Sequence, residues 1–232
     1  MARIFLNCKE ALSEIERDIA EMGIMVHPHS MQNKIVKDDE NFSTLEVQNY
    51  SFTILDSSDK DEIVPNLEWC KAEFTERIAN WDNKNVERLN PGQAWTLRKE
   101  IWNEFLVDGK FCYSYNELVT DHEQLKLIIN ELKENPDTRQ AILILHGRDQ
   151  KYHMRKKRIP CSVFYHFMIR EGGLDIIYAM RSCDYDTHFA NDIWHACEIR
   201  NFVASQVGIK PRLFHMNISS LHRYKNYTKH VF

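Results

Sequence analysis

Covalent chemistry in this sequence would depend on one cysteine and on the polar side chains downstream of it. Cys161 precedes an apolar stretch, and a cysteine acts as a nucleophile only when nearby groups favour its thiolate. Arg181, Ser182 and Asp184 follow in the string MRSCD, and residues 188–192 come soon after. We expect the other cysteines to be small buried hydrophobic residues, because that is the usual state of this residue type.

Short motifs along the chain resemble the thymidylate synthase family. They run from about Thr44 to Tyr227, and because they occur in the family's order, chance is a poor explanation. They are Asn135-Pro136-Asp137-Thr138-Arg139, Arg158-Ile159-Pro160-Cys161, Arg181-Ser182-x-Asp184, the FANDIW stretch from Phe189, and Ser220-Leu221-His222-Arg223-Tyr224. The resemblance implies an α+β (α/β layered) fold, with a mixed β-sheet, flanking helices and a homodimer formed sheet to sheet.

This resemblance also implies how a substrate would be held and attacked. In the family, a cysteine that corresponds to Cys161 attacks C6 of a pyrimidine deoxynucleotide monophosphate, which makes C5 nucleophilic toward the methylene of 5,10-methylenetetrahydrofolate. Arg181 is similar to the arginine beside the sulfur and the phosphate, and Ser182 to a serine that binds the phosphate. Arg139 would reach the phosphate from the partner subunit. Gln140 stands where the family often has a second arginine, so phosphate binding is expected to be weaker or supplied elsewhere.

Further matches concern the sugar, the folate and water. His222 and Tyr224 look like the pair that holds the sugar hydroxyl, and Asp184 looks like the carboxylate that faces the pterin. Without the resemblance, each would be read as an ordinary surface or core residue. Trp102 and Phe105 resemble the aromatic wall beside the methylene carbon. Tyr113 is similar to the family tyrosine that orders water near the cysteine.

Asp192 departs from the family and predicts the base. Thymidylate synthases have an asparagine at this position, eight residues beyond the counterpart of Asp184. Uracil offers an N3 donor and an O4 acceptor, whereas cytosine offers an N3 acceptor and an N4 donor. One proton shared between Asp192 and N3, with the other oxygen accepting from N4, satisfies cytosine and leaves uracil badly paired. Aspartate here also resembles the phage deoxycytidylate hydroxymethylases.

Other departures bear on the step after methylene transfer. The family glutamate that relays protons through water falls at Asn66, or at Glu68 in another helical register; asparagine can position water but cannot act as a general base. Ser162 replaces a family histidine, which is expected to loosen the water network. The chain ends at Phe232, eight residues beyond Tyr224, so we expect no long tail over the folate. A more open site favours the addition of water to the methylene intermediate.

The favoured interpretation is therefore a folate-dependent deoxycytidylate 5-hydroxymethyltransferase in the nucleotide pool of a DNA-modifying phage or a similar element. Three alternatives stay open: methylation of the same cytosine, thymidylate synthesis from deoxyuridylate, and an inactive nucleotide-binding relative. A zinc cytidine deaminase is disfavoured, because its signature requires a second cysteine that this chain lacks.

Composition predicts one catalytic domain over residues 1–232. With 43% hydrophobic residues and a formal net charge of -4, the chain is unlike a disordered protein or a nucleic-acid coat. None of its 7 glycines forms a dinucleotide or P-loop pattern, and the cysteines have no CxxC spacing, so no metal is expected. The uncharged runs are too short for a membrane span and the N-terminus does not resemble a secretory signal, so we expect a cytoplasmic address. The basic residues 155–158 are expected to be solvated or to steer an anionic nucleotide.

Changes in hydrophobic period place these residues on alternating helices and strands. Pro65 is expected in the first turn of a helix, and Gly23 and Gly208 at helix ends. The remaining expected helices are 10–22, with an apolar stripe of Leu12, Ile15, Ile19 and Met22; 66–78, with Leu67, Cys70, Phe74 and Ile78 inward; 122–134; and one through Ile193, Cys197, Arg200 and Val203. The expected strands are 44–55 with a bulge, 141–145 in a central position, and 161–169 and 174–180 joined by a turn.

Overall fold

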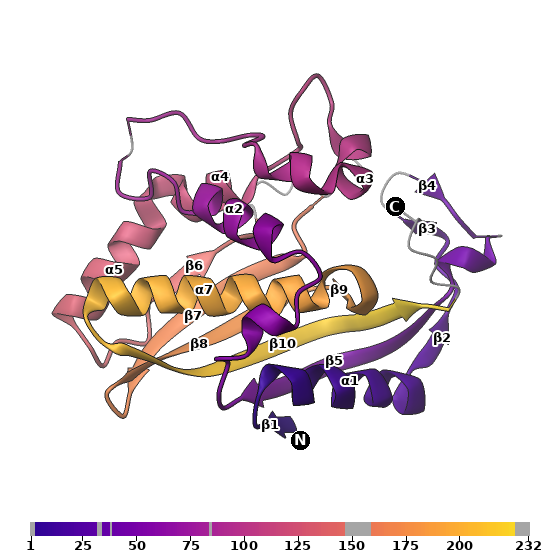
Figure 1. Ribbon diagram of the computed structural model, residues 1–232, viewed down its shortest axis with the longest axis horizontal. Helices are drawn as coiled ribbons and strands as arrows, with labels where there is room; N and C mark the ends of the chain where they lie inside the picture. The colour runs from indigo at the N-terminus through magenta and orange to yellow at the C-terminus, as the bar shows by residue number, and fades with distance from the viewer. Residues whose placement is uncertain (1–2, 32–33, 38, 84, 147–158, 226–232) are drawn as a thin grey trace.

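A mixed β-sheet lies behind the helices in the computed structural model, which describes residues 3–31, 34–37, 39–83, 85–146 and 159–225 (Figure 1). Its strands run in the order β1-β5-β10-β8-β7-β6, with β2 paired to β5 and β9 paired to β10. The strands are β1 (Arg3–Phe5), β2 (Ile24–Val26), β5 (Thr44–Ile54), β6 (Ile142–Ile144), β7 (Ser162–Arg170), β8 (Gly173–Met180), β9 (Cys183–Asp184) and β10 (Lys210–Tyr224). A separate small hairpin pairs β3 (Ser30–Met31) with β4 (Lys34–Ile35).

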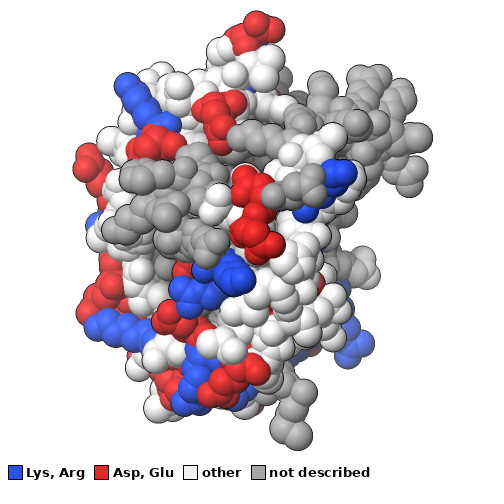
Figure 2. Space-filling view, turned by 90° about the vertical axis from the view of Figure 1, so that its right-hand side faces the viewer, with Lys and Arg blue, Asp and Glu red and all other residues white. Residues whose placement is uncertain are grey.

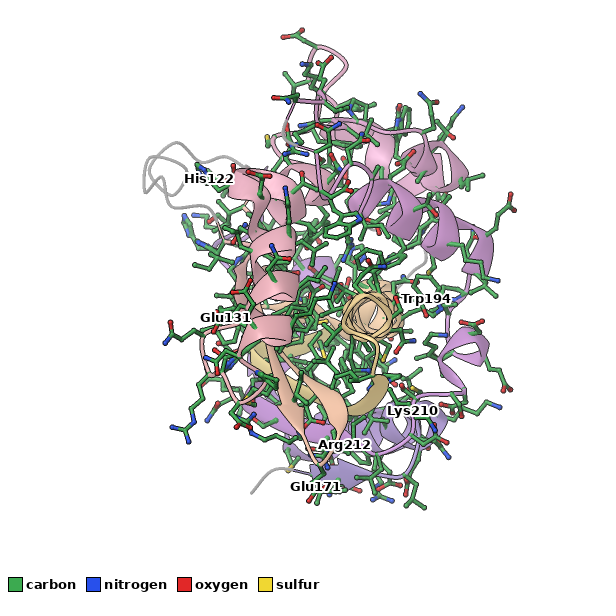
Figure 3. All side chains as sticks on the ribbon, turned by 90° about the vertical axis from the view of Figure 1, so that its left-hand side faces the viewer. His122, Glu131, Glu171, Trp194, Lys210 and Arg212 are labelled. Carbon is green, nitrogen blue, oxygen red and sulfur yellow. The ribbon has the colours of Figure 1, made fainter. Side chains whose placement is uncertain are left out.

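The helices include long ones that pack on the sheet and short ones that lie above its edge in Figure 1. They are α1 (Cys8–Met22), α2 (Leu67–Arg77), α3 (Lys99–Trp102), α4 (Tyr115–Thr120), α5 (Gln124–Glu134) and α7 (Ala190–Val207). Helix α7 is the central one: ten of its residues are buried, and Figure 3, which looks along it, shows side chains on every side of it. None of the helices in the described part of the chain has the length and apolar character needed to cross a bilayer.

Helix positions agree with the hydrophobic pattern, but two details do not. Ile15 and Ile19 of α1 are buried as expected, whereas Met22 is 53% exposed because it lies in the last turn, at the edge of the sheet. Pro65 lies before α2 rather than in its first turn. The helix begins with Asn66 as its N-cap, whose side chain accepts a hydrogen bond of 2.9 Å from the Trp69 N–H.

Helix ends follow local chemistry. Gly208 ends α7 with a φ of 84°, a left-handed conformation that glycine adopts without strain. Gly23 ends α1 for a different reason: its φ is −64°, but a Cβ atom there would lie 2.4 Å from the Ile19 carbonyl oxygen.

The strand predictions are confirmed except for the place of 141–145. β7 and β8 are joined at Glu171 and Gly172, which both have positive φ as a two-residue hairpin turn requires. β6 is an edge strand rather than a central one. Its sequence is continuously apolar because Leu143 faces the core while Ile142 and Ile144, each 40% exposed, lie on the opposite face of the sheet.

In the middle of the sheet, the alternation of side chains between its two faces shifts by one residue. In β5 the core-facing residues shift from Val47 to Tyr50, and Asn49 between them has a φ of 53°. The pairing of β5 with β10 keeps a constant register, because β10 changes phase at the same level, from Ile218 to Leu221. The predicted extra residue is therefore present, but the neighbouring strand matches it instead of forming an isolated bulge.

The same break separates β8 from β9 and creates the wall of a cavity. Met180 and Cys183 are both in the core, and they pair with Ile218 and Leu221 of β10. Arg181, which lies between them, and the alternate residues of the neighbouring strands point into the cavity instead. The cavity-lining residues beyond the break are Thr44, Glu46, Arg181, Ser182, Asp184, Ser220, His222 and Tyr224.

Candidate active site

A cavity of about 720 Å³ brings together most of the predicted site residues. It is bounded by the bent strands, by the start of α7, by α2, and by the segment that contains α3 and α4. The predicted site residues that line it are Trp102, Phe105, Tyr113, Cys161, Arg181, Ser182, Asp184, Asp192, His222 and Tyr224.

Cys161 and Arg181 are neighbours in the wall of the cavity. Cys161 immediately precedes β7, and its carbonyl oxygen accepts a hydrogen bond of 2.9 Å from the Arg181 N–H. The Arg181 side chain turns back along the same segment: Nε donates to the Pro160 carbonyl oxygen at 2.9 Å, and Nη2 lies 3.7 Å from the Cys161 Sγ. A guanidinium in this position stabilises a thiolate by charge, so the geometry suits a nucleophilic cysteine.

Asp192 lies in the first turn of α7, where its partly buried side chain lines the cavity. Burial raises the pKa of its carboxyl from 3.8 to about 7, although a hydrogen bond from the Cys183 thiol and the charge of Arg77 oppose the shift. The Cys183 Sγ lies 3.4 Å from Asp192 Oδ2. A carboxyl group with this pKa can hold a proton near neutral pH and act as a hydrogen-bond donor.

Asp184 and His222 face each other across the parallel pair of β9 and β10. Burial raises the pKa of Asp184 and lowers the pKa of His222. Asp184 Oδ1 also accepts hydrogen bonds from the backbone N–H groups of Asp186 and Thr187, at 3.1 and 3.3 Å. One carboxylate thus lines the cavity and caps the turn that leads into α7.

Aromatic side chains form the wall opposite the strands. The Trp102 ring lies 6.1 Å from Phe105, 6.4 Å from Phe111 and 5.7 Å from His188, measured between ring centroids. The rings are tilted or edge-on to one another, and together they present an aromatic surface of the kind that receives a heterocycle such as a pterin.

Two residues that were predicted to be catalytic, Asn66 and Glu68, do not line the cavity, which corrects their predicted place in the site. Asn66 is the N-cap of α2, and Glu68 is exposed in its first turn, so neither is among the cavity-lining residues. Arg139 is exposed just before β6 and also does not line the cavity of its own chain.

Some predictions fall outside the described residues: the basic segment 155–158, Tyr227 and the end of the chain at Phe232. Over the side of the molecule that carries β2 to β4, acidic and basic side chains of the described residues are interspersed (Figure 2). Among the described residues, no cluster of three or more histidine, cysteine or acidic side chains could hold a metal ion.

Two acidic residues of α2, Glu73 and Glu76, line the cavity, and motif matching missed both; Glu73 is the one paired with Arg77. Its Oε1 accepts hydrogen bonds from Arg77 Nη2 at 2.9 Å and Nε at 3.1 Å. Burial raises the pKa of Glu73, and the charge of Arg77 opposes that shift. A signal was present in the helical spacing, because Glu73 and Arg77 fall on the same face as the inward-facing Cys70 and Phe74.

Ser162, expected to leave a loose water network, instead joins a chain of buried hydroxyl groups. Its Oγ lies 2.9 Å from the Tyr115 hydroxyl and 2.5 Å from the Tyr178 hydroxyl. The guanidinium of Arg77 stacks on the Tyr115 ring at 4.1 Å and donates to the Tyr165 hydroxyl at 3.4 Å. Polar contacts therefore link the residue after the nucleophile to the ion pair on α2.

Comparison with known proteins agrees with this architecture. Residues 35–232 match the sequence model of the family described as thymidylate synthase. A putative thymidylate synthase of Methanosarcina acetivorans is 24% identical over 163 residues, which are 66% of this chain and 73% of that protein. One of Methanothermobacter marburgensis is 30% identical over 142 residues, 58% of this chain and 61% of that protein. In fold, the chain is similar to the crystal structure of thymidylate synthase from T4 phage, with a TM-score of 0.71 at 18% identity, covering 96% of this chain and 78% of that one.

Proposed function

The chain belongs to the thymidylate synthase family, and from this premise we propose that it hydroxymethylates C5 of deoxycytidylate with 5,10-methylenetetrahydrofolate. As a family member it transfers a one-carbon unit to a pyrimidine nucleotide. The choice of cytosine and the hydroxymethyl product are specific to this proposal, and the observation that carries the proposal is the cavity-lining carboxyl of Asp192, whose pKa is raised to about 7.

Asp192 supports cytosine through its proton. With a pKa of about 7, its carboxyl can donate to the unprotonated N3 of cytosine while its other oxygen accepts from the N4 amino group. Uracil would place its own N3–H and O4 against the same atoms: the ionised carboxylate then accepts from N3–H, but its other oxygen meets O4, acceptor against acceptor. A buried mismatch of this kind costs roughly 1–3 kcal/mol or more, enough to select between the bases.

Cys161 begins the proposed reaction. Its thiolate adds to C6, and C5 of the resulting adduct attacks the methylene carbon of the folate. Loss of the C5 proton and departure of tetrahydrofolate leave an exocyclic methylene on the ring. Arg181 and Ser182, both at the cavity wall, would bind the phosphate, and His222 and Tyr224, also at the wall, would bind the sugar.

In this proposal, the folate binds at the aromatic end of the cavity. Trp102 and Phe105 provide an aromatic surface, and Asp184 provides a carboxylate for the polar edge of the pterin. In the hydroxymethylation branch, water attacks the exocyclic methylene and the folate leaves as tetrahydrofolate without oxidation. Glu73 is the carboxylate that would receive the water proton.

Product analysis with each nucleotide tests this proposal. The protein is incubated with methylenetetrahydrofolate and either C5-tritiated deoxycytidylate or C5-tritiated deoxyuridylate. We expect tritium release from deoxycytidylate, a hydroxymethyl product by mass spectrometry, and no rise in absorbance at 340 nm from dihydrofolate. Tritium release from deoxyuridylate alone would establish a thymidylate synthase instead, and a methylated cytosine with dihydrofolate would establish a methyltransferase. Turnover by Cys161→Ala at the wild-type rate would refute the nucleophilic mechanism.

A further inference from the structure

His195 lies beside Glu73 and has no role in the chemistry described so far. It is on α7, one turn beyond Asp192, and only 2% of it is exposed. Its Nδ1 lies 3.1 Å from Glu73 Oε2. Neither of these two atoms, nor His195 Nε2, has a hydrogen-bond partner among the described residues, so the contact is close but is not a hydrogen bond in this state. Such contacts often align only when substrate binds.

Aromatic rings hold His195 in place. The rings of Trp69 and Trp194 pack against the His195 ring in edge-to-face contacts. The centroid distances are 5.4 and 5.2 Å, and the interplanar angles are 85° and 90°. Burial lowers the pKa of His195 well below its usual range, so the ring is neutral and carries one proton. Because the atom opposite Nδ1 is a carboxylate oxygen, the Nδ1–H tautomer is the one that satisfies both groups.

We propose that His195 is a positioning residue: its Nδ1–H holds Oε2 of Glu73 while Arg77 holds Oε1, so that the ionised carboxylate is fixed toward the attacking water. This inference rests on the proposed function, because it concerns the water step. Arg77 lies 2.9 and 3.1 Å from the first oxygen, and His195 3.1 Å from the second, so each oxygen has a nitrogen within hydrogen-bond distance. Removing either anchor leaves a buried oxygen without a donor.

The step that His195 supports is the addition of water. The water oxygen bonds to the exocyclic methylene carbon, and its proton passes to Glu73. The π electrons of the methylene move into the ring and then re-form the C5–C6 double bond, which expels the Cys161 sulfur. One proton returns as the thiol re-forms, so the reaction consumes water, releases tetrahydrofolate unoxidised and leaves the enzyme unchanged.

The pH dependence of this step reports on a defined set of groups. His195 and Asp192 face Glu73 from α7, and Arg77 and Glu76 lie on α2 with it. The other charged or titratable groups that act on the pair among the described residues include Cys70 and Tyr165, which interact with Glu73, Arg98, whose charge acts on His195, and Tyr115, on which Arg77 stacks.

Three variants separate positioning from packing. His195→Asn places an amide N–H near the position of Nδ1, His195→Gln places it near Nε2, and His195→Ala removes the donor. Trp194→Phe is the matched control, because it disturbs the packing of the same ring without contacting Glu73. Each variant is assayed for tritium release from C5 of deoxycytidylate, which precedes the water step, and for hydroxymethyl product, which follows it; thermal unfolding verifies the fold.

For His195→Ala and His195→Gln we expect product formation to fall about tenfold or more relative to tritium release, with the intermediate captured by added 2-mercaptoethanol. The acid limb of the kcat profile should move up by about one pH unit, since Glu73 loses a donor to its charged form, while KM for deoxycytidylate stays within about twofold. His195→Asn and Trp194→Phe should retain the wild-type ratio and profile.

Two results would overturn the inference, and they are distinguishable. If the wild type makes hydroxymethyl product but His195→Ala keeps its ratio and pH profile, or His195→Asn is as impaired as His195→Gln, only the role of His195 is refuted. If the wild type makes no hydroxymethyl product from deoxycytidylate, the proposed function fails as well, because there is no attacking water to position.

Discussion

A carboxyl group enclosed by protein keeps its proton to a higher pH than one in water, because burial penalises the charged form. Asp192 shows this effect beside Cys183 of β9, and its pKa of about 7 lies where a proton can be shared with a base. At the scale of the residue, the discrimination between cytosine and uracil thus depends on one proton rather than on the shape of the cavity.

Replacing Asp192 by asparagine should transfer the preference from cytosine to uracil. An amide offers one donor and one acceptor in the arrangement that uracil matches, so kcat/KM for deoxycytidylate is expected to fall about 100-fold or more and that for deoxyuridylate to rise. Competition between the two nucleotides, followed by mass spectrometry, measures the change. Asp175→Asn, at a buried carboxylate that pairs with Arg212 outside the cavity, is the control and should leave the preference unaltered.

The affinity for deoxycytidylate should also depend on pH in a definite direction. Below pH 7 Asp192 already carries the proton shared with N3; above pH 7 the proton must be taken from solvent on binding, so the dissociation constant should rise about tenfold per pH unit. Calorimetric titration of Cys161→Ser, in which no adduct forms, measures this slope. A flat profile between pH 7 and 9, or the same slope in the Cys161→Ser, Asp192→Asn double variant, would contradict the shared proton.

At the level of residues, the motifs identified side chains that line the cavity, whereas a residue that only helix geometry brings there was missed. Cys161, Arg181 and Asp192 were found in the sequence, and the structure places all three at one cavity. Glu73 was missed because no motif surrounds it, and a shift of one helical turn or more along α2 separates it from Asn66 and Glu68. Its burial with Arg77 is a tertiary property that the local sequence does not display.

Helix α2 illustrates how an element, rather than a single residue, determines the site. Its N-cap Asn66 sets where the helix begins, and the helical repeat then carries Glu73 and Arg77 to the cavity. The residues at the N-terminus are consequently structural, although their sequence position suggested chemistry.

Asn66→Ala should therefore destabilise the protein while sparing turnover. Loss of the cap to the Trp69 N–H is expected to lower the free energy of unfolding by about 1 kcal/mol, with kcat within about twofold of wild type. Glu73→Gln should show the reverse, with kcat reduced about 100-fold and stability largely kept. Urea unfolding and steady-state kinetics measure both quantities, and Glu68→Gln is the exposed control. A catalytic collapse in Asn66→Ala would restore the original interpretation of that residue.

At the scale of the whole molecule, one face of the sheet has apolar side chains without a described covering helix. Register places one row across the neighbouring strands, and Ile142 and Ile4 at its two ends are 40% and 68% exposed. In order, the row is Ile142, His166, Ile177, His215, Thr53 and Ile4. We propose that a second copy of the chain covers this face, in the sheet-to-sheet manner expected from the resemblance. Arg139, exposed at the beginning of β6, would then extend to the phosphate site of the partner.

Complementation between two inactive variants tests this arrangement. Arg139→Ala and Cys161→Ala should each have little activity alone. When they are unfolded together and refolded, about half of the dimers should be mixed and each mixed dimer should have one intact site, so activity should recover to about a quarter of the wild-type level. Recovery indistinguishable from the sum of the separate variants would show that Arg139 does not act across the interface, and sedimentation measures the dimer independently.

The matched change of phase across β5, β10 and the β8–β9 break has a consequence for how this fold can vary. Deleting Asn49 alone would send every residue from Thr44 to Gln48 to the wrong side of the sheet, while β10 kept its own alternation. Compensation would need simultaneous deletions in two other strands that are distant in sequence. The three strand segments would therefore have to change together. Substitutions of side chains within the cavity are expected to be tolerated far more readily than the loss of a single residue from the strands that form it.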